Sequence, residues 1–263
     1  METDVLKPGK LSPFSDGVFS DRNSMLVVGL VAVLLPPLAV VFNGLRCGKF
    51  SPASSVSQNY FTGGHSIFVG CMCIVGVLLL AYQGWRKSSN RFQGVLAKIA
   101  AAGAFGVGLI PTKLDNQNLR GFTVPECNSL AESLNSIRLT NLPGTWEPVL
   151  HGICAFILFA WLIYVVWTQF TEKSGDSVER CEPDRKEFRN KIYRSCVCFM
   201  VLGILICFGN ELASFFTKGK SDIWSILFVG ETIALLAFGV AWLVKSRWLW
   251  GYNGQQFGYL RSN

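Results

Sequence analysis

The chain has 263 residues, half of them hydrophobic and only 16% charged, and its mean hydropathy is positive. This balance excludes an ordinary soluble domain and places the protein in the membrane class. A net charge of +7 would suggest nucleic acid as the partner of a soluble protein, but here most of the excess lies where a membrane protein meets anionic lipid. We therefore expect membrane lipids as partners and no nucleic acid.

Six apolar segments follow one another along the chain, and each predicts a membrane-spanning helix. They are residues 24–45, 60–85, 92–112, 148–170, 191–210 and 223–245. All but the fifth contain an uncharged or nearly uncharged run of the roughly 20 residues that a bilayer core requires. The fifth run is shorter, but Lys191 and Arg194 before it have long side chains that reach back to the headgroups. The sequence predicts an all-α polytopic bundle of six spans over residues 24–249.

The third span and the connection before the fifth carry further information. Ala100, Ala104 and Gly108 lie on one face of the third span, so neighbouring helices can approach its backbone closely. We therefore expect this span at the centre of the bundle. Residues 172–189 are densely charged, which predicts a solvated linker leading into the fifth span.

Lysine and arginine are distributed unevenly between alternate connections. Sixteen of the 24 lie on one side of the predicted membrane and seven lie on the other. Because positively charged connections stay in the cytoplasm, the N-terminal tail, residues 1–23, and the C-terminal tail, residues 250–263, are both predicted to be cytoplasmic. The long connection 113–147 is then external. No cleavable signal peptide is evident, so we expect the first span to remain in the mature chain.

Two cysteines, Cys47 and Cys127, fall on the predicted external side. If that side is oxidising, they can form a disulfide that ties the first external connection to the third. Six other cysteines lie within spans, where cysteine is a common small apolar residue, and Cys181 is predicted to be cytoplasmic. The sequence leaves open whether Cys47 and Cys127 are close enough to bond.

Four polar side chains near the external side are candidate ligand-binding residues. Glu231 lies inside the sixth span, about 13 Å from its external end at ~1.5 Å per residue. An ionisable residue within a span costs ~2.5 kcal/mol or more and is a functional-site hypothesis. If the second, fourth and sixth spans converge, His65, His151, Glu211 and Glu231 line one polar pocket. The alternative is structural, with Glu231 protonated or hydrogen-bonded to a neighbouring helix so that it holds the bundle in register.

Catalytic patterns are weak in this chain. Catalytic zinc usually takes three protein ligands, and two histidines with Glu231 meet that number, but no paired-ligand spacing such as His-x-x-x-His is present. Ser66 lies in Gly-Gly-His-Ser-Ile, which is not a nucleophile elbow, and the glycine patterns of nucleotide-binding loops are absent. The sequence therefore favours a protein that is not an enzyme and predicts no metal or cofactor.

Several short segments resemble a widespread, mostly bacterial family of uncharacterised membrane proteins with about six spans. The segments are Ser57–Gly70 (SQNYFTGGHSIFVG), Ala81–Trp85 (AYQGW), Leu109–Thr112 (LIPT), His151–Phe159 (HGICAFILF), Asn190–Arg194 (NKIYR), and Glu231 with Phe238–Lys245 (FGVAWLVK). The resemblance implies a helical bundle in which His151 and Glu231 occupy recurring positions. The chain departs from the pattern at His65, where the family carries an arginine, and at Gly63–Gly64, where it carries a turn with proline. The resemblance brings no activity with it.

Three functions remain open from the sequence. The first is recognition or passage of a lipid or small polar molecule, with Glu231 as its charge or proton partner. The second is an intramembrane hydrolase or transferase acting on lipid, with His151 and Glu231 as acid and base or as metal ligands. The third is a membrane scaffold whose polar residues hold helices together. The sequence does not indicate an oligomeric state.

Overall fold

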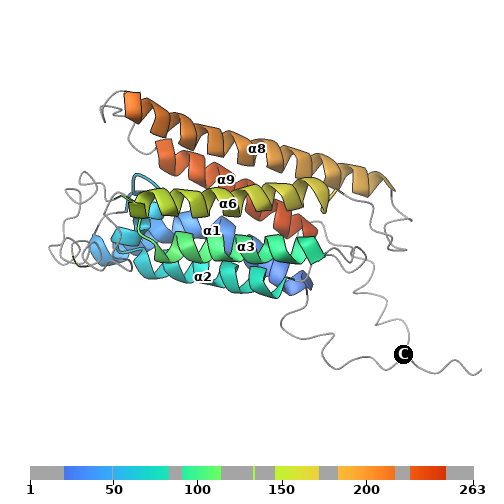
Figure 1. The fold of residues 1–263 in the computed structure, drawn as a ribbon, viewed down its shortest axis with the longest axis horizontal. Helices are drawn as coiled ribbons and strands as arrows, with labels where there is room; N and C mark the ends of the chain where they lie inside the picture. The colour runs from blue at the N-terminus through green and yellow to red at the C-terminus, as the bar shows by residue number, and fades with distance from the viewer. Residues whose placement is uncertain are drawn as a thin grey trace, which may run out of the picture.

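The computed structural model describes residues 21–48, 50–82, 91–113, 133, 146–171, 183–216 and 226–246. These residues form helices α1 (Asp21–Cys47), α2 (His65–Ala81), α3 (Arg91–Leu109), α6 (Trp146–Thr168), α8 (Pro183–Phe216) and α9 (Ile226–Lys245), with a short 3-10 helix η1 (Ser57–Phe61) before α2 (Figure 1). The described part of the chain contains no strand, so the predicted all-α class is confirmed for it.

Four helices are long and apolar enough to cross a bilayer. They lie within Asn23–Cys47, Trp146–Thr168, Glu187–Ala213 and Ile226–Lys245. The other two apolar helices, His65–Ala81 and Gln93–Leu109, are shorter. These lengths support an integral membrane protein with four candidate spanning helices.

The predicted second and fifth spans differ from the helices in the structure. The second was expected over 60–85, but α2 begins at His65 and ends at Ala81. α8 has 34 residues and rises about 51 Å, more than the ~30 Å of a bilayer core. The solvated linker predicted over 172–189 is therefore wrong for 183–189, which are helical, and residues 172–182 lie outside the described residues. Proline at the first helical position has the φ angle that a helix start requires, which explains why α8 begins at Pro183.

The helices form a ring in which each packs against its neighbours. α1 packs against α2 and α9, α3 packs between α2 and α6, and α8 packs against α9. The contact between α6 and α8 that closes the ring is much less extensive. Figure 1 shows α8 diverging from α6 toward the C-terminal end of α8. The ring is therefore tight except on the side between α6 and α8.

Close helix approaches occur where the sequence carries small residues. Ala100 and Ala104 of α3 are fully buried, as the small-residue face predicts. A Cβ built on Gly230 of α9 would lie 2.9 Å from the carbonyl oxygen of Gly203 in α8, so these two backbones approach each other directly. α3 packs extensively against two helices, α2 and α6, and so does α9, against α1 and α8. The expectation that the third span lies at the centre is wrong, because the described helices form a ring with none of them at its centre.

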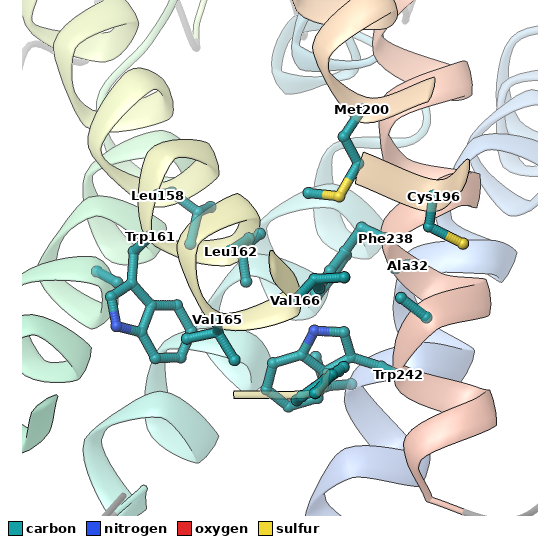
Figure 2. Packing of buried hydrophobic residues seen from close by; sticks show 14 of the residues in the cluster. Ala32, Leu158, Trp161, Leu162, Val165, Val166, Cys196, Met200, Phe238 and Trp242 are labelled. Carbon is teal, nitrogen blue, oxygen red and sulfur yellow. The ribbon is translucent and has the colours of Figure 1, made fainter. Parts of the chain in front are cut away.

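The main hydrophobic core contains side chains from all six helices, and Figure 2 shows where those of α1, α6, α8 and α9 meet. Trp161 of α6 and Trp242 of α9 are 6% and 2% exposed, and their ring centroids are 6.5 Å apart. Phe238 meets Trp242 edge to face at 5.5 Å, a favourable geometry for aromatic pairs. These large side chains fill the half of the bundle near the C-terminal end of α9, and the candidate site lies toward the opposite end.

Candidate functional site

The segment between α1 and α2 folds over one end of the bundle and is held there by buried hydrogen bonds. We call residues 50–64, which include η1, the η1 segment. Asn43 of α1 donates a hydrogen bond to the side-chain oxygen of Asn59 at 2.9 Å, and Asn59 donates to the Val56 carbonyl at 2.8 Å. The backbone N–H of Gly64 donates to the Asn43 side chain at 2.8 Å. The η1 segment is thus anchored to α1 by side chains that are almost fully buried.

Glu231 anchors the same segment to α9. The backbone N–H of Val56 donates to one oxygen of the carboxylate, and the Ser57 hydroxyl donates to the other at 3.2 Å. The backbone N–H of Phe228, one turn before Glu231, donates to the Ser54 carbonyl at 3.0 Å. The hydrogen-bond donors to Glu231 therefore come from the η1 segment.

A small cavity lies inside the ring beneath the η1 segment. Its volume is about 70 Å³, room for about two water molecules at ~30 Å³ each. Residues of α1, α2, α3, α6, α9 and the η1 segment line it, and most of them are apolar. The polar side chains in its wall are Ser57, His151 and Glu231.

A larger groove lies where α6 and α8 are in least contact, with α9 as its floor. Its volume is about 420 Å³. Phe156 of α6 and Phe208 of α8 line it and are 69% and 64% exposed, so the groove opens on the outer surface of two candidate spanning helices. Ala155, Phe159 and Glu231 line the groove and also the inner cavity. Glu231 therefore stands between the interior of the ring and its open side.

The four predicted ligand-binding residues occupy different places in this arrangement. His151 is 5% exposed, lines the inner cavity with Glu231, and its Nδ1 lies 2.8 Å from the Ile110 carbonyl oxygen. Glu211 lines the groove with Glu231 and is exposed. His65 lines neither space. His151 and Glu231 thus line the inner cavity together, and Glu211 and Glu231 line the groove together.

His65 has local contacts at the start of α2. Its Nδ1 lies 2.5 Å from the Tyr60 carbonyl oxygen, and its ring meets the Tyr60 ring edge to face at 4.8 Å. Burial raises the pKa of Tyr60, and the Glu147 carboxylate raises it further, so the phenol is held in its neutral form. These contacts support a packing role for His65.

Sequence analysis missed the η1 segment as part of the site. Residues 60–64 were assigned to the second span because they continue its uncharged run. Residues 55–59 were left in the connection before that span. Their polar side chains are buried, with Ser55 and Asn59 each 1% exposed. A signal was present in the run Ser-Ser-Val-Ser-Gln-Asn at residues 54–59, which is polar but uncharged next to a span. Such a run fits a segment that is buried in protein, where its backbone and side chains find partners.

Cys47, at the end of α1, is disulfide-bonded. The six cysteines described within α2, α6 and α8 are free thiols. The predicted partner, Cys127, lies outside the described residues, so the pairing of Cys47 with Cys127 stays a prediction. A Cβ built on Gly63 would lie 3.0 Å from the Cys47 sulfur, so the η1 segment packs directly against this cysteine.

Neither a metal cluster nor a known relative indicates the chemistry of the site within the residues that the structure describes. Within the part of the chain that the structure describes, no group of three or more His, Cys, Asp or Glu residues could hold a metal ion. No protein-family model, curated protein or solved structure matches the chain. The function is therefore argued from the geometry around Glu231.

Proposed function

We propose that this is a six-span integral membrane protein, with both termini in the cytoplasm, that recognises or passes a lipid or a small polar molecule at a pocket centred on Glu231. One observation carries the proposal: Glu231 forms part of the wall of both the inner cavity and the groove. A carboxylate in a candidate spanning helix is costly, and this one lies where a molecule from the bilayer can reach it. A volume of 420 Å³ with mostly apolar walls is typical of small-molecule sites, which span ~300–1,000 Å³.

Helices α2 and α3 support six spans by their position and length. α2 packs along α1 and α3 packs along α6, and both of these partners are candidate spanning helices. With 17 and 19 residues, α2 and α3 fall within the ~17–25 residues that cross a bilayer. Six spans return the chain to the side on which it began, and the excess of lysine and arginine there favours the cytoplasm.

A second candidate is a membrane scaffold, which the hydrogen bonds of Glu231 favour. The carboxylate accepts a backbone N–H from Val56 and a hydroxyl from Ser57, so it ties α9 to the η1 segment whether or not a ligand binds. In that case Glu231 stabilises the fold and the groove is lined with lipid like any other outer surface.

An intramembrane hydrolase or transferase has less support. Ser57, His151 and Glu231 line one cavity, which brings together the residue types of a nucleophile, a base and an acid. Among the contacts of the described residues, however, the Ser57 hydroxyl is hydrogen-bonded to Glu231, and His151 Nδ1 faces the Ile110 carbonyl. A catalytic triad requires the base to bind the nucleophile and the acid to orient the base. The arrangement does not have that order.

Native mass spectrometry of the detergent-purified protein tests the proposal. We expect the wild type to carry a bound lipid or small molecule at one per protein, and Glu231→Gln to lose it. Glu187→Gln is the matched control, because Glu187 is exposed on α8 and pairs with Lys191 at 3.0 Å, away from the groove. Thermal unfolding shows that each variant is folded. A wild type with nothing bound, together with a less stable Glu231→Gln, would leave the scaffold as the function.

A further inference from the structure

The groove between α6 and α8 is polar at one end and apolar at the other. The two helices run antiparallel (Figure 1), so Gly152 near the start of α6 and Glu211 near the end of α8 lie at the same end of the groove. Ile163 and Val201 line the opposite end. A molecule that fits both ends must itself have one polar and one apolar end.

The length of the groove matches one leaflet of a bilayer. The residues of α6 that line the groove are spaced three or four apart, so they form one stripe along that helix. They are Gly152, Ala155, Phe156, Phe159, Ala160 and Ile163. From the first to the last of them the helix rises about 16 Å at ~1.5 Å per residue. This is close to half of the ~30 Å hydrocarbon core. The groove is therefore long enough to hold an aliphatic chain of about the length that one leaflet accommodates.

The polar end of the groove is acidic. The described residues that line the groove include two carboxylates, Glu211 at its polar end and Glu231 on its α9 floor, and no lysine, arginine or histidine. The η1 segment supplies the hydrogen-bond donors of Glu231, and the same carboxylate lines the groove, so its charge acts on a molecule bound there. Opposite charges attract strongly where water is scarce, so a cationic head fits this end and an anionic head is repelled.

We infer that the groove binds one aliphatic chain of a membrane amphiphile whose primary ammonium head lies between Glu211 and Glu231. The inference rests on the proposed function and adds the class of ligand to it. Lipid tails are as apolar as the groove walls, so the chain contributes fit and little preference over bulk lipid. The two carboxylates supply the selectivity.

Three probes with the same aliphatic chain length and different head groups separate the contribution of the chain from that of the head. They are hexadecylamine, hexadecanol and palmitic acid, and each is titrated against the full-length protein in detergent by native mass spectrometry. Gly152→Phe fills the polar end of the groove. Gly209→Phe is its matched control on α8, because it does not line the groove. A Cβ at either glycine meets no atom within 4 Å, so a side chain can start at both positions without displacing a neighbour, and thermal unfolding compares the folding of the two variants.

We expect hexadecylamine to bind about tenfold more tightly than hexadecanol, with palmitic acid weakest. Gly152→Phe should weaken the binding of hexadecylamine by about tenfold or more, and Gly209→Phe should leave that affinity unchanged. Glu211→Gln should reduce the difference in affinity between hexadecylamine and hexadecanol, because one of the two carboxylates remains. Glu211 is exposed and outside the η1 contacts, so its loss of charge is not expected to affect folding.

Two results would overturn the inference and leave the proposed function standing. Equal binding of the three probes, all blocked by Gly152→Phe, would mean that the groove takes a chain without selecting an ammonium head. A co-purifying molecule that Glu231→Gln loses and Gly152→Phe retains would place the ligand in the inner cavity. If the wild type binds no probe and carries no co-purifying molecule, both the inference and the proposed function fail.

Discussion

The two sides of Glu231 are built in opposite ways. Toward the η1 segment, buried polar groups are paired with one another, from the Asn43–Asn59 hydrogen bond to the Val56 and Ser57 contacts of the carboxylate. Toward α6 and α8, the neighbouring side chains are mostly apolar, Phe156 and Phe208 among them are exposed, and the two helices make little contact. The comparison shows that one carboxylate can stabilise a fold on one face and remain accessible to a ligand on the other. The predictions below test whether the two sides differ as much in energy as they do in contacts.

The largest difference is expected between two phenylalanines, one on each side. Phe61 of η1 is 2% exposed, and Phe208 in the groove is 64% exposed. Phe61→Ala leaves a cavity and should lower the free energy of unfolding by about 3–5 kcal/mol. Phe208→Ala removes few contacts and should cost less than about 1 kcal/mol. Reversible unfolding in detergent measures both. Similar losses in the two variants would mean that the groove is packed as tightly as the η1 segment.

The disulfide of Cys47 should contribute next. Cys47→Ser frees the end of α1 next to the η1 segment, and removing a native disulfide typically costs about 2–4 kcal/mol. Peptide mapping by mass spectrometry without reduction should find Cys47 linked to Cys127. Cys73→Ser is a control on a free thiol of α2 and should leave the map unchanged. A link from Cys47 to Cys181 would contradict the predicted topology, which places these two on opposite sides of the membrane.

Removal of the Glu231 carboxylate should have the smallest of the three effects. Glu231→Ala leaves the Val56 N–H and the Ser57 hydroxyl without this acceptor, and an unsatisfied buried group costs about 1–3 kcal/mol. Glu187→Ala removes an exposed ion pair on α8 and should change stability by less than about 1 kcal/mol. Thermal unfolding of the two variants in the same detergent compares them. Equal stability would show that the η1 segment does not depend on Glu231.

Several elements of the fold could be predicted from the sequence because their signals are local. The apolar runs that became α1, α6 and α9 are long, and their composition alone indicates a membrane environment. Glu231 was recognised as a candidate because a charge in such a run has few explanations. The small residues Ala100 and Ala104 of α3 are buried at a close helix contact as their spacing predicts.

Other elements could not be predicted, because they depend on partners far away in the chain. Hydropathy assigned Tyr60–Gly64 to the second span, but the N–H of Gly64 donates to Asn43 and the Thr62 hydroxyl donates to the Asn59 carbonyl, and α2 begins only at His65. The charged start of α8 was taken as a linker, since charge density alone does not distinguish a solvated helix from a loop.

The sequence by itself determined an all-α membrane protein and the presence of a carboxylate within its last apolar helix, because both follow from the composition of single segments. The tertiary structure decided what surrounds that carboxylate. Ser57 and Glu231 are 174 residues apart in the chain and are joined only because α1 and α9 pack side by side. The groove exists because α8 packs on α9 and diverges from α6, and no single segment encodes the space between two helices.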